Sequence, residues 1–94
     1  MTLEELYQII CDRRDHPTPG SYTVSLFEKG EDEILKKVGE EAVEVILAAQ
    51  RQGEQRLTEE IADLTYHLLV LMASRHLEPS QVLNELEQRH KPKK

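Results

Sequence analysis

Residues 31–52 read EDEILKKVGEEAVEVILAAQRQ, and this stretch decides the fold class. Its apolar side chains repeat at the spacing of an α-helix, about 100° per residue. They form a stripe of Ile34, Val38, Ala42, Val45 and Ala49. We predict a long helix from about Glu31 to about Gln52, ended by Gly53, because glycine commonly follows the last turn of a helix.

A second long helix is expected after a short connection at residues 53–57. Thr58 is its candidate N-cap, because a threonine hydroxyl can accept a backbone hydrogen bond at a helix start, and the helix reaches about Arg75. Its apolar stripe contains Ile61, Leu64, Leu68, Leu71 and Met72. The two long helices can therefore form an antiparallel hairpin.

Shorter helices are predicted on both sides of this pair. Thr2 and Glu5 have the spacing of a capping box, so a helix is expected from there to the Pro-rich loop at residues 16–20. We expect that first helix to turn four side chains inward: Leu3, Leu6, Ile9 and Ile10.

Residues 21–23 are predicted to continue the loop. Ser25 and Glu28 repeat the capping-box spacing, so a short helix is expected before Gly30. Pro79 is predicted to be the first residue of a last helix, a position that proline tolerates. No segment shows the alternation of a strand. The 94 residues are thus expected to form one all-α domain, a bundle of four to five helices, with residues 91–94 as a disordered basic tail.

The charge balance excludes some classes of partner. The formal net charge is −6, and the segment 28–63 carries 11 acidic and 5 basic residues. A general nucleic-acid binder normally has a basic face, so nucleic acid is not expected as a partner. The longest apolar run, residues 68–73, is too short to cross a membrane, and Cys11 is the only cysteine. We expect a soluble, cytoplasmic protein.

Both long helices carry apolar residues outside their main stripes. Val43 and Leu47 lie opposite the first stripe, and Leu69 and Val70 fill other faces of the second helix. Helices that are apolar almost all round are usually covered on all sides, which predicts a homodimer for a chain of this size. The alternative is an ordinary scatter of exposed apolar residues.

Four carboxylates lie at the edges of the apolar stripes. Glu41 and Glu44 are three residues apart on the first long helix, and Glu60 and Asp63 repeat that spacing on the second. In a hairpin the two pairs can face each other. Four oxygen donors without cysteine suit a hard cation such as Mg²⁺, which in turn suits phosphate chemistry. The alternative is a solvated acidic face, in which Lys36 and Lys37 pair with acids one turn away.

Other candidate motifs are weaker. The sequence has no HExxH, GxxxxGK[ST] or GxSxG motif, which excludes the usual zincins, P-loop NTPases and α/β-hydrolases. Glu87 and His90 have the spacing of half a di-iron site, but a second copy is missing. His67, one turn after Asp63, is either a residue that orients a ligand or a hydrogen-bonded core histidine.

Three segments together resemble the phosphoribosyl-ATP pyrophosphatase family. They are Gly20-Ser21-Tyr22-Thr23, residues 37–44 (KVGEEAVE) and residues 60–70 (EIADLTYHLLV). The likeness extends over about residues 3–89. The paired acidic motifs alone would indicate only the wider all-α NTP pyrophosphatase superfamily, which includes MazG-like enzymes and dimeric dUTPases.

This resemblance implies Mg²⁺-dependent hydrolysis of 1-(5-phosphoribosyl)-ATP to phosphoribosyl-AMP and pyrophosphate, in histidine biosynthesis, by an intertwined homodimer. The implied metal ligands are Glu41, Glu44, Glu60 and Asp63, and Glu40 is implied as a further ligand or water-orienting base. Substrate binding is expected from Ser21, Tyr22, Thr23 and Lys37. A related pyrophosphatase with another substrate and a non-catalytic helical dimer remain the alternatives.

Overall fold

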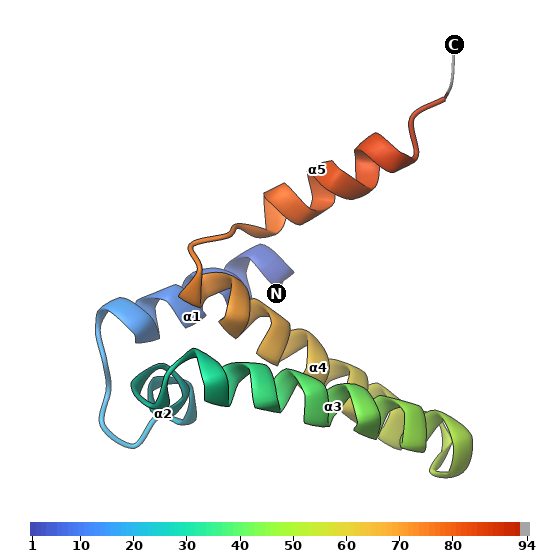
Figure 1. The fold of residues 1–94 in the computed structure, drawn as a ribbon, viewed down its shortest axis with the longest axis horizontal. Helices are drawn as coiled ribbons and strands as arrows, with labels where there is room; N and C mark the ends of the chain where they lie inside the picture. Colours follow the sequence, from blue (N-terminus) through green and yellow to red (C-terminus); the bar gives the residue numbers. More distant parts are fainter. Residues whose placement is uncertain (93–94) are drawn as a thin grey trace.

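The computed structural model describes residues 1–92, and in this range it contains five α-helices and no strand (Figure 1). The all-α prediction is confirmed. The helices are α1 (Leu3–Asp15), α2 (Tyr22–Lys29), α3 (Glu31–Arg51), α4 (Gly53–Ser74) and α5 (Pro79–Arg89). Of the expected basic tail, residues 93 and 94 lie outside the described part of the chain.

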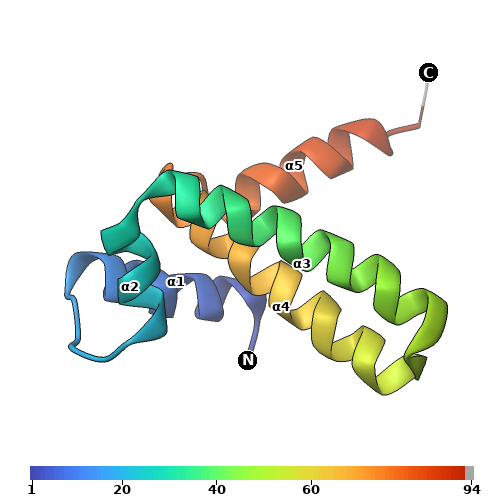
Figure 2. The same cartoon turned by 60° about the horizontal axis from the view of Figure 1, so that its bottom comes forward.

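The two long helices α3 and α4 form the predicted hairpin, and they make the most extensive helix–helix contact in the described structure (Figure 2). The predicted connection was wrong, because only Gln52 separates the helices. Gly53 has φ of 81°, a conformation that glycine adopts without steric cost, so the chain reverses at once. Thr58 lies inside α4, where its hydroxyl donates to the carbonyl of Glu54 instead of capping the helix.

The ends of the other helices follow from local side-chain bonds. The capping box of Thr2 and Glu5 is confirmed, and so is Pro79 at the start of α5. The start of α2 was predicted wrongly. Ser21 is the N-cap and accepts a hydrogen bond from the backbone of Val24, so the helix begins four residues earlier than a cap at Ser25 would place it.

The core lies where α1, α2 and α3 pack around the second half of α4. It consists of Tyr7, Ile10, Leu26, Ile34, Leu69, Val70 and Ala73. The predicted stripe of α4 was therefore rotated, since Leu69 and Val70 are buried while Ile61 and Leu68 are exposed. The reason is that α4 packs against α1 as well as α3, which periodicity alone does not reveal. On α3, Ala48 rather than Ala49 is buried.

Helix α1 is also turned from its predicted orientation. Ile10 is buried as expected, but Leu3 and Ile9 are exposed, and Tyr7 is buried instead. The Tyr7 hydroxyl donates to the carbonyl oxygen of Leu77 at 2.6 Å, which ties α1 to the segment after α4. Burial raises the pKa of Tyr7 to about 12, so this hydroxyl keeps its proton.

Helix α5 projects away from the rest of the chain (Figure 1). None of its residues is buried, and its apolar side chains Val82, Leu83 and Leu86 are exposed. No helix in the described range is long and apolar enough to span a membrane. The site region is thus set by the α3–α4 hairpin and by α2, which packs against the start of α3.

Candidate active site

Three of the predicted carboxylates converge between the long helices. Glu41 comes from α3, and Glu60 and Asp63 come from successive turns of α4. One oxygen atom from each of the three lies within 4.8 Å of the others. Glu60 is buried, with a relative exposure of 5%, Glu41 is half-buried and Asp63 is exposed. We call these three residues the carboxylate cluster.

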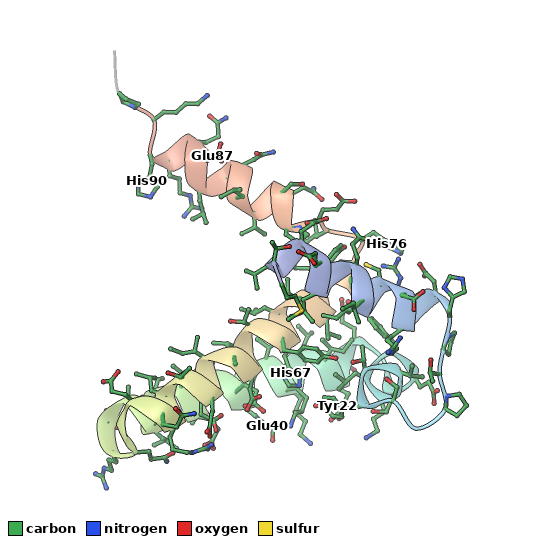
Figure 3. All side chains as sticks on the ribbon, turned by 180° about the vertical axis from the view of Figure 1, so that it is seen from behind. Tyr22, Glu40, His67, His76, Glu87 and His90 are labelled. Atoms are coloured by element: carbon green, nitrogen blue, oxygen red, sulfur yellow. The ribbon has the colours of Figure 1, made fainter. Side chains whose placement is uncertain are left out.

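The other two predicted acids lie outside this cluster. Glu44 is half-buried one turn further along α3, and Glu40 is exposed on the same helix (Figure 3). Neither belongs to the group of carboxylates that converge in the described part of the chain. A role for Glu44 as a fourth ligand and a role for Glu40 in orienting water stay predictions.

Two cations flank the cluster. The amino group of Lys37 lies 3.6 Å from Oε1 of Glu41 and 3.9 Å from Oε1 of Glu40. Arg56, one turn before Glu60 on α4, forms ion pairs with both Glu59 and Glu60. Arg56 was missed by the sequence analysis, although its four-residue spacing from Glu60 was a visible signal.

Crowding among the acids shows in the electrostatics of Glu41. Burial raises the pKa of the Glu41 carboxyl, and the neighbouring Asp63 carboxylate acts in the same direction, while Lys37 and His67 oppose them. The charged form of Glu41 is therefore disfavoured where no cation lies between the acids. A divalent cation bound by these oxygens would reverse that balance.

His67 connects the cluster to α2. Its Nδ1 lies 2.7 Å from the backbone carbonyl oxygen of Asp63, which can only accept a hydrogen bond. Nδ1 therefore carries the proton, and in the neutral ring Nε2 accepts one from the hydroxyl of Tyr22 at 2.8 Å (Figure 3). His67 is buried, so the interpretation as a hydrogen-bonded core histidine is confirmed. Tyr22 is consequently held beside the cluster.

Next to this bond, the hydroxyl of Thr23 bonds with the hydroxyl of Tyr66. Thr23 is buried, with a relative exposure of 6%. A direct contact between this hydroxyl and a substrate would require that bond to open. Consecutive residues of α2 thus pair with consecutive residues of α4, which fixes the start of α2 over the middle of α4.

The loop before α2 and α2 itself border an open hollow of about 520 Å³, which we call the loop hollow. Its lining is Pro17, Thr18, Pro19, Gly20, Ser21, Tyr22, Val24, Ser25 and Glu28. The Ser21 hydroxyl accepts from the backbone N–H of Val24 at 3.3 Å, which leaves its own proton available to a ligand. No lysine or arginine is among the lining residues, whereas Glu28 adds a negative charge.

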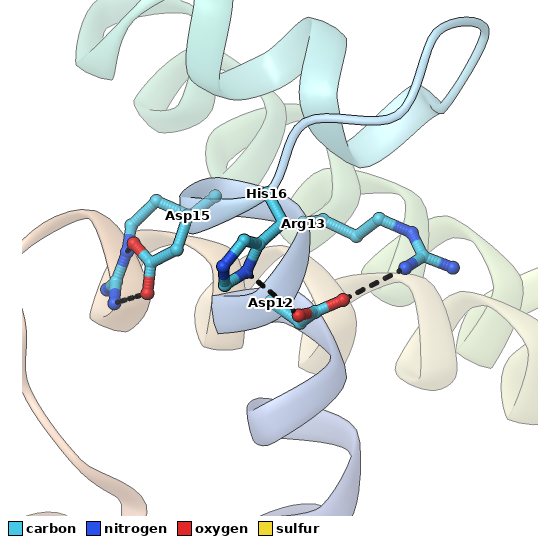
Figure 4. Close-up of polar contacts among 5 residues, drawn as sticks. Asp12, Arg13, Asp15 and His16 are labelled. Carbon is cyan, nitrogen blue, oxygen red and sulfur yellow. Dashed lines mark hydrogen bonds and ion pairs between the residues drawn. The ribbon is translucent and has the colours of Figure 1, made fainter.

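The Glu87 and His90 motif lies outside the cluster, and two further arginines are engaged in ion pairs on their own helices. Arg13 pairs with Asp12 on α1 at 3.4 Å (Figure 4), and Arg89 pairs with Glu85 on α5 at 3.2 Å. Glu87 and His90 lie at the far end of α5, away from the cluster (Figure 3). Half a di-iron site is therefore not completed by other residues of the described chain.

Comparison with known proteins adds an independent line of evidence. A family model described as Phosphoribosyl-ATP pyrophosphohydrolase matches residues 3–90. The phosphoribosyl-ATP pyrophosphatase of Pelotomaculum thermopropionicum is 54% identical over 91 residues, which cover 97% of this chain and 93% of that protein. The phosphoribosyl-ATP pyrophosphatase of Listeria welshimeri is 55% identical over 87 residues, 93% of this chain and 84% of that protein. A bifunctional histidine biosynthesis protein of Nostoc sp. is 43% identical over 96% of this chain, which spans 42% of that longer protein.

Proposed function

Because the chain belongs to the phosphoribosyl-ATP pyrophosphohydrolase family, we propose that its carboxylate cluster is the centre at which phosphoribosyl-ATP is hydrolysed. The chain is a hydrolase of histidine biosynthesis, and its products are phosphoribosyl-AMP and pyrophosphate. The observation that carries the proposal is the convergence of Glu41, Glu60 and Asp63 from two helices. The expected alternatives, another nucleotide substrate and a non-catalytic dimer, are not favoured by any contact in the described structure.

The cluster fits a magnesium ion. It offers three carboxylate oxygens and no sulfur or imidazole ligand, a donor set that hard cations prefer. Glu41, Glu60 and Asp63 would hold the ion, and we propose Glu44, one turn further along α3, as a fourth ligand. Bound there, Mg²⁺ would offset phosphate charge and lower the pKa of a coordinated water.

The other residues have supporting roles in this proposal. Lys37, beside Glu41, neutralises phosphate charge at the reacting end of the substrate, and exposed Glu40 orients the attacking water. Ser21 and Tyr22 contact the substrate near the loop hollow. Thr23 is buried beneath that contact and holds the start of α2 in place through its bond with Tyr66.

We place the reaction in the cytoplasm, because a single cysteine is typical of proteins in a reducing compartment.

The test is a pyrophosphate-release assay with phosphoribosyl-ATP, run with Mg²⁺ and again with excess EDTA. We expect release in the first condition and none in the second. Release that is unaffected by EDTA would remove the metal from the proposal, and no release with either would remove the activity.

Mg²⁺ is also expected to stabilise the folded chain. At a concentration well above its Kd, a ligand that binds only the folded state should raise the Tm by about 5 °C or more for a domain of this size. Glu41→Gln should reduce that rise while leaving the metal-free protein at least as stable, because its carboxylate is crowded by Asp63. Differential scanning calorimetry with and without Mg²⁺ measures both effects.

Glu87→Gln is the matched control, since it removes the same charge from exposed α5. It should keep the full rise in Tm. An unchanged Mg²⁺ response in Glu41→Gln would exclude Glu41 from the ion site.

We further propose that the protein is a homodimer. An apolar groove of about 490 Å³ lies between α1, α4 and α5, and the hairpin exposes Val43, Ile46, Leu47 and Ile61. Large exposed apolar side chains in this number point to an interface in a small protein. Of the residues predicted for the interface, Leu69 and Val70 are in the core, which leaves Val43 and Leu47.

Light scattering should therefore give about twice the chain mass of 10.9 kDa at micromolar concentration. Leu83→Asp, in the apolar groove on α5, should shift the protein towards monomer, whereas Lys91→Glu just beyond α5 should not. An active monomer at this concentration would contradict the dimer.

A further inference from the structure

The carboxylate cluster and its two cations form a nearly balanced set of charges. Lys37 pairs with Glu41, and Arg56 pairs with Glu60, while Asp63 has no ion pair within the described residues. At neutral pH the five groups carry a formal charge of −1 with all three acids ionised. A divalent cation among the carboxylates would offset much of the negative charge that Glu41 and Glu60 offer the flanking cations, so Lys37 and Arg56 would then be attracted less strongly.

Arg56 is held at this position by a buried acid. The Glu60 side chain is 7% exposed, whereas the Arg56 side chain is 47% exposed and also contacts Glu59 at the surface. An ordinary exposed ion pair at this spacing stabilises a helix only weakly. Burying the Glu60 charge without a partner would cost far more, so in the metal-free protein Arg56 is the counter-ion of Glu60.

We propose that Arg56 has a second role: it releases Glu60 when a divalent cation binds, and its guanidinium then binds the phosphate groups of the substrate. The inference rests on the proposed function, because it takes the cluster as the cation site. A carboxylate shared with a cation attracts the guanidinium less, and the half-exposed side chain of Arg56 can turn outward. A guanidinium matches two phosphate oxygens at once, which makes a polyphosphate the natural new partner.

The proposal predicts opposite effects of Arg56→Gln on metal and on substrate. Without substrate, Mg²⁺ should bind about 3-fold to 10-fold more tightly, because a cation that competes with it for Glu60 is removed. A tenfold change in Kd corresponds to about 1.4 kcal/mol. At saturating Mg²⁺, the KM for phosphoribosyl-ATP should rise about tenfold, because a charge-assisted hydrogen bond is lost. A merely structural ion pair would not tighten metal binding.

The experiment combines isothermal titration calorimetry of Mg²⁺ into substrate-free protein with steady-state kinetics. Arg56→Lys keeps the charge, so it should retain the wild-type metal affinity and recover part of the KM. Arg51→Gln removes an exposed charge from the end of α3 and should change neither quantity. Circular dichroism confirms that each variant is folded before it is measured.

Unchanged or weaker Mg²⁺ binding in folded Arg56→Gln would overturn the competition with metal. An unchanged KM would overturn the contact with phosphate. If wild-type protein bound Mg²⁺ but released no pyrophosphate, the proposed function would fail, while the calorimetric comparison would still test the counter-ion role of Arg56.

Discussion

Glu60→Gln is expected to lower kcat for phosphoribosyl-ATP by more than about 100-fold at saturating Mg²⁺. Replacing even a residue that only hydrogen-bonds to a metal ligand typically lowers metal affinity or activity by about 10-fold to 100-fold. Glu60 is the most buried member of the carboxylate cluster. The amide keeps the shape of the side chain and can still accept from Arg56, so the fold is retained. The measurement is pyrophosphate release, with circular dichroism to confirm the helices.

Glu59→Gln is the matched control. Glu59 is the preceding residue, also pairs with Arg56, and is 45% exposed outside the cluster. We expect its activity to stay within about twofold of wild type, as for most surface substitutions. A Glu60→Gln variant with more than a tenth of wild-type kcat would place the reaction elsewhere.

Most of the fold could be predicted because its signals are local. A capping box, a glycine and a proline fix the ends of α1, α3 and α5 within a few residues. The start of α2 could not be decided, since Ser21 and Ser25 both resemble an N-cap, and only the structure shows which hydroxyl accepts from the helix. The faces of α4 could not be assigned, because burial there depends on contacts with two other helices.

The candidate site divides in the same way. Glu41, Glu60 and Asp63 could be predicted to meet, since their three-residue spacings define helix faces and a hairpin aligns them. The bond between Tyr22 and His67 joins residues 45 positions apart, and no spacing rule reveals it. Arg56 was visible as a four-residue pair, but its importance depends on the burial of Glu60, which the sequence does not show.

The second large effect expected is in substrate choice. The carboxylate cluster can recognise only a polyphosphate, so it should not distinguish phosphoribosyl-ATP from ATP. The additional ribose phosphate must make contacts that ATP cannot make, and such remote binding energy also positions the reacting phosphates. We expect kcat/KM for ATP to be lower by about 100-fold or more, the discrimination that a site with dedicated polar contacts achieves.

The loop hollow is our candidate for the additional phosphate, and two substitutions there should act in opposite directions. Ser21→Ala removes a hydroxyl whose proton is free, so kcat/KM for phosphoribosyl-ATP should fall about tenfold. The same hydroxyl caps α2, so the slow reaction with ATP should also fall, but by less. Glu28→Gln removes the only carboxylate lining the hollow and should raise kcat/KM for phosphoribosyl-ATP alone. Competition kinetics with the two substrates measure both changes.

Thr23→Val separates substrate contact from support of the fold. Thr23 is buried and bonded to Tyr66, so the substitution should lower the free energy of unfolding by about 1–3 kcal/mol, because the Tyr66 hydroxyl loses its partner. The ratio of kcat/KM for the two substrates should stay unchanged.

An equal loss of both activities in Ser21→Ala would assign the loop to the common catalytic machinery. Hydrolysis of ATP as efficient as that of phosphoribosyl-ATP would mean that no part of this chain reads the additional phosphate, and the hollow would then have no role in recognition.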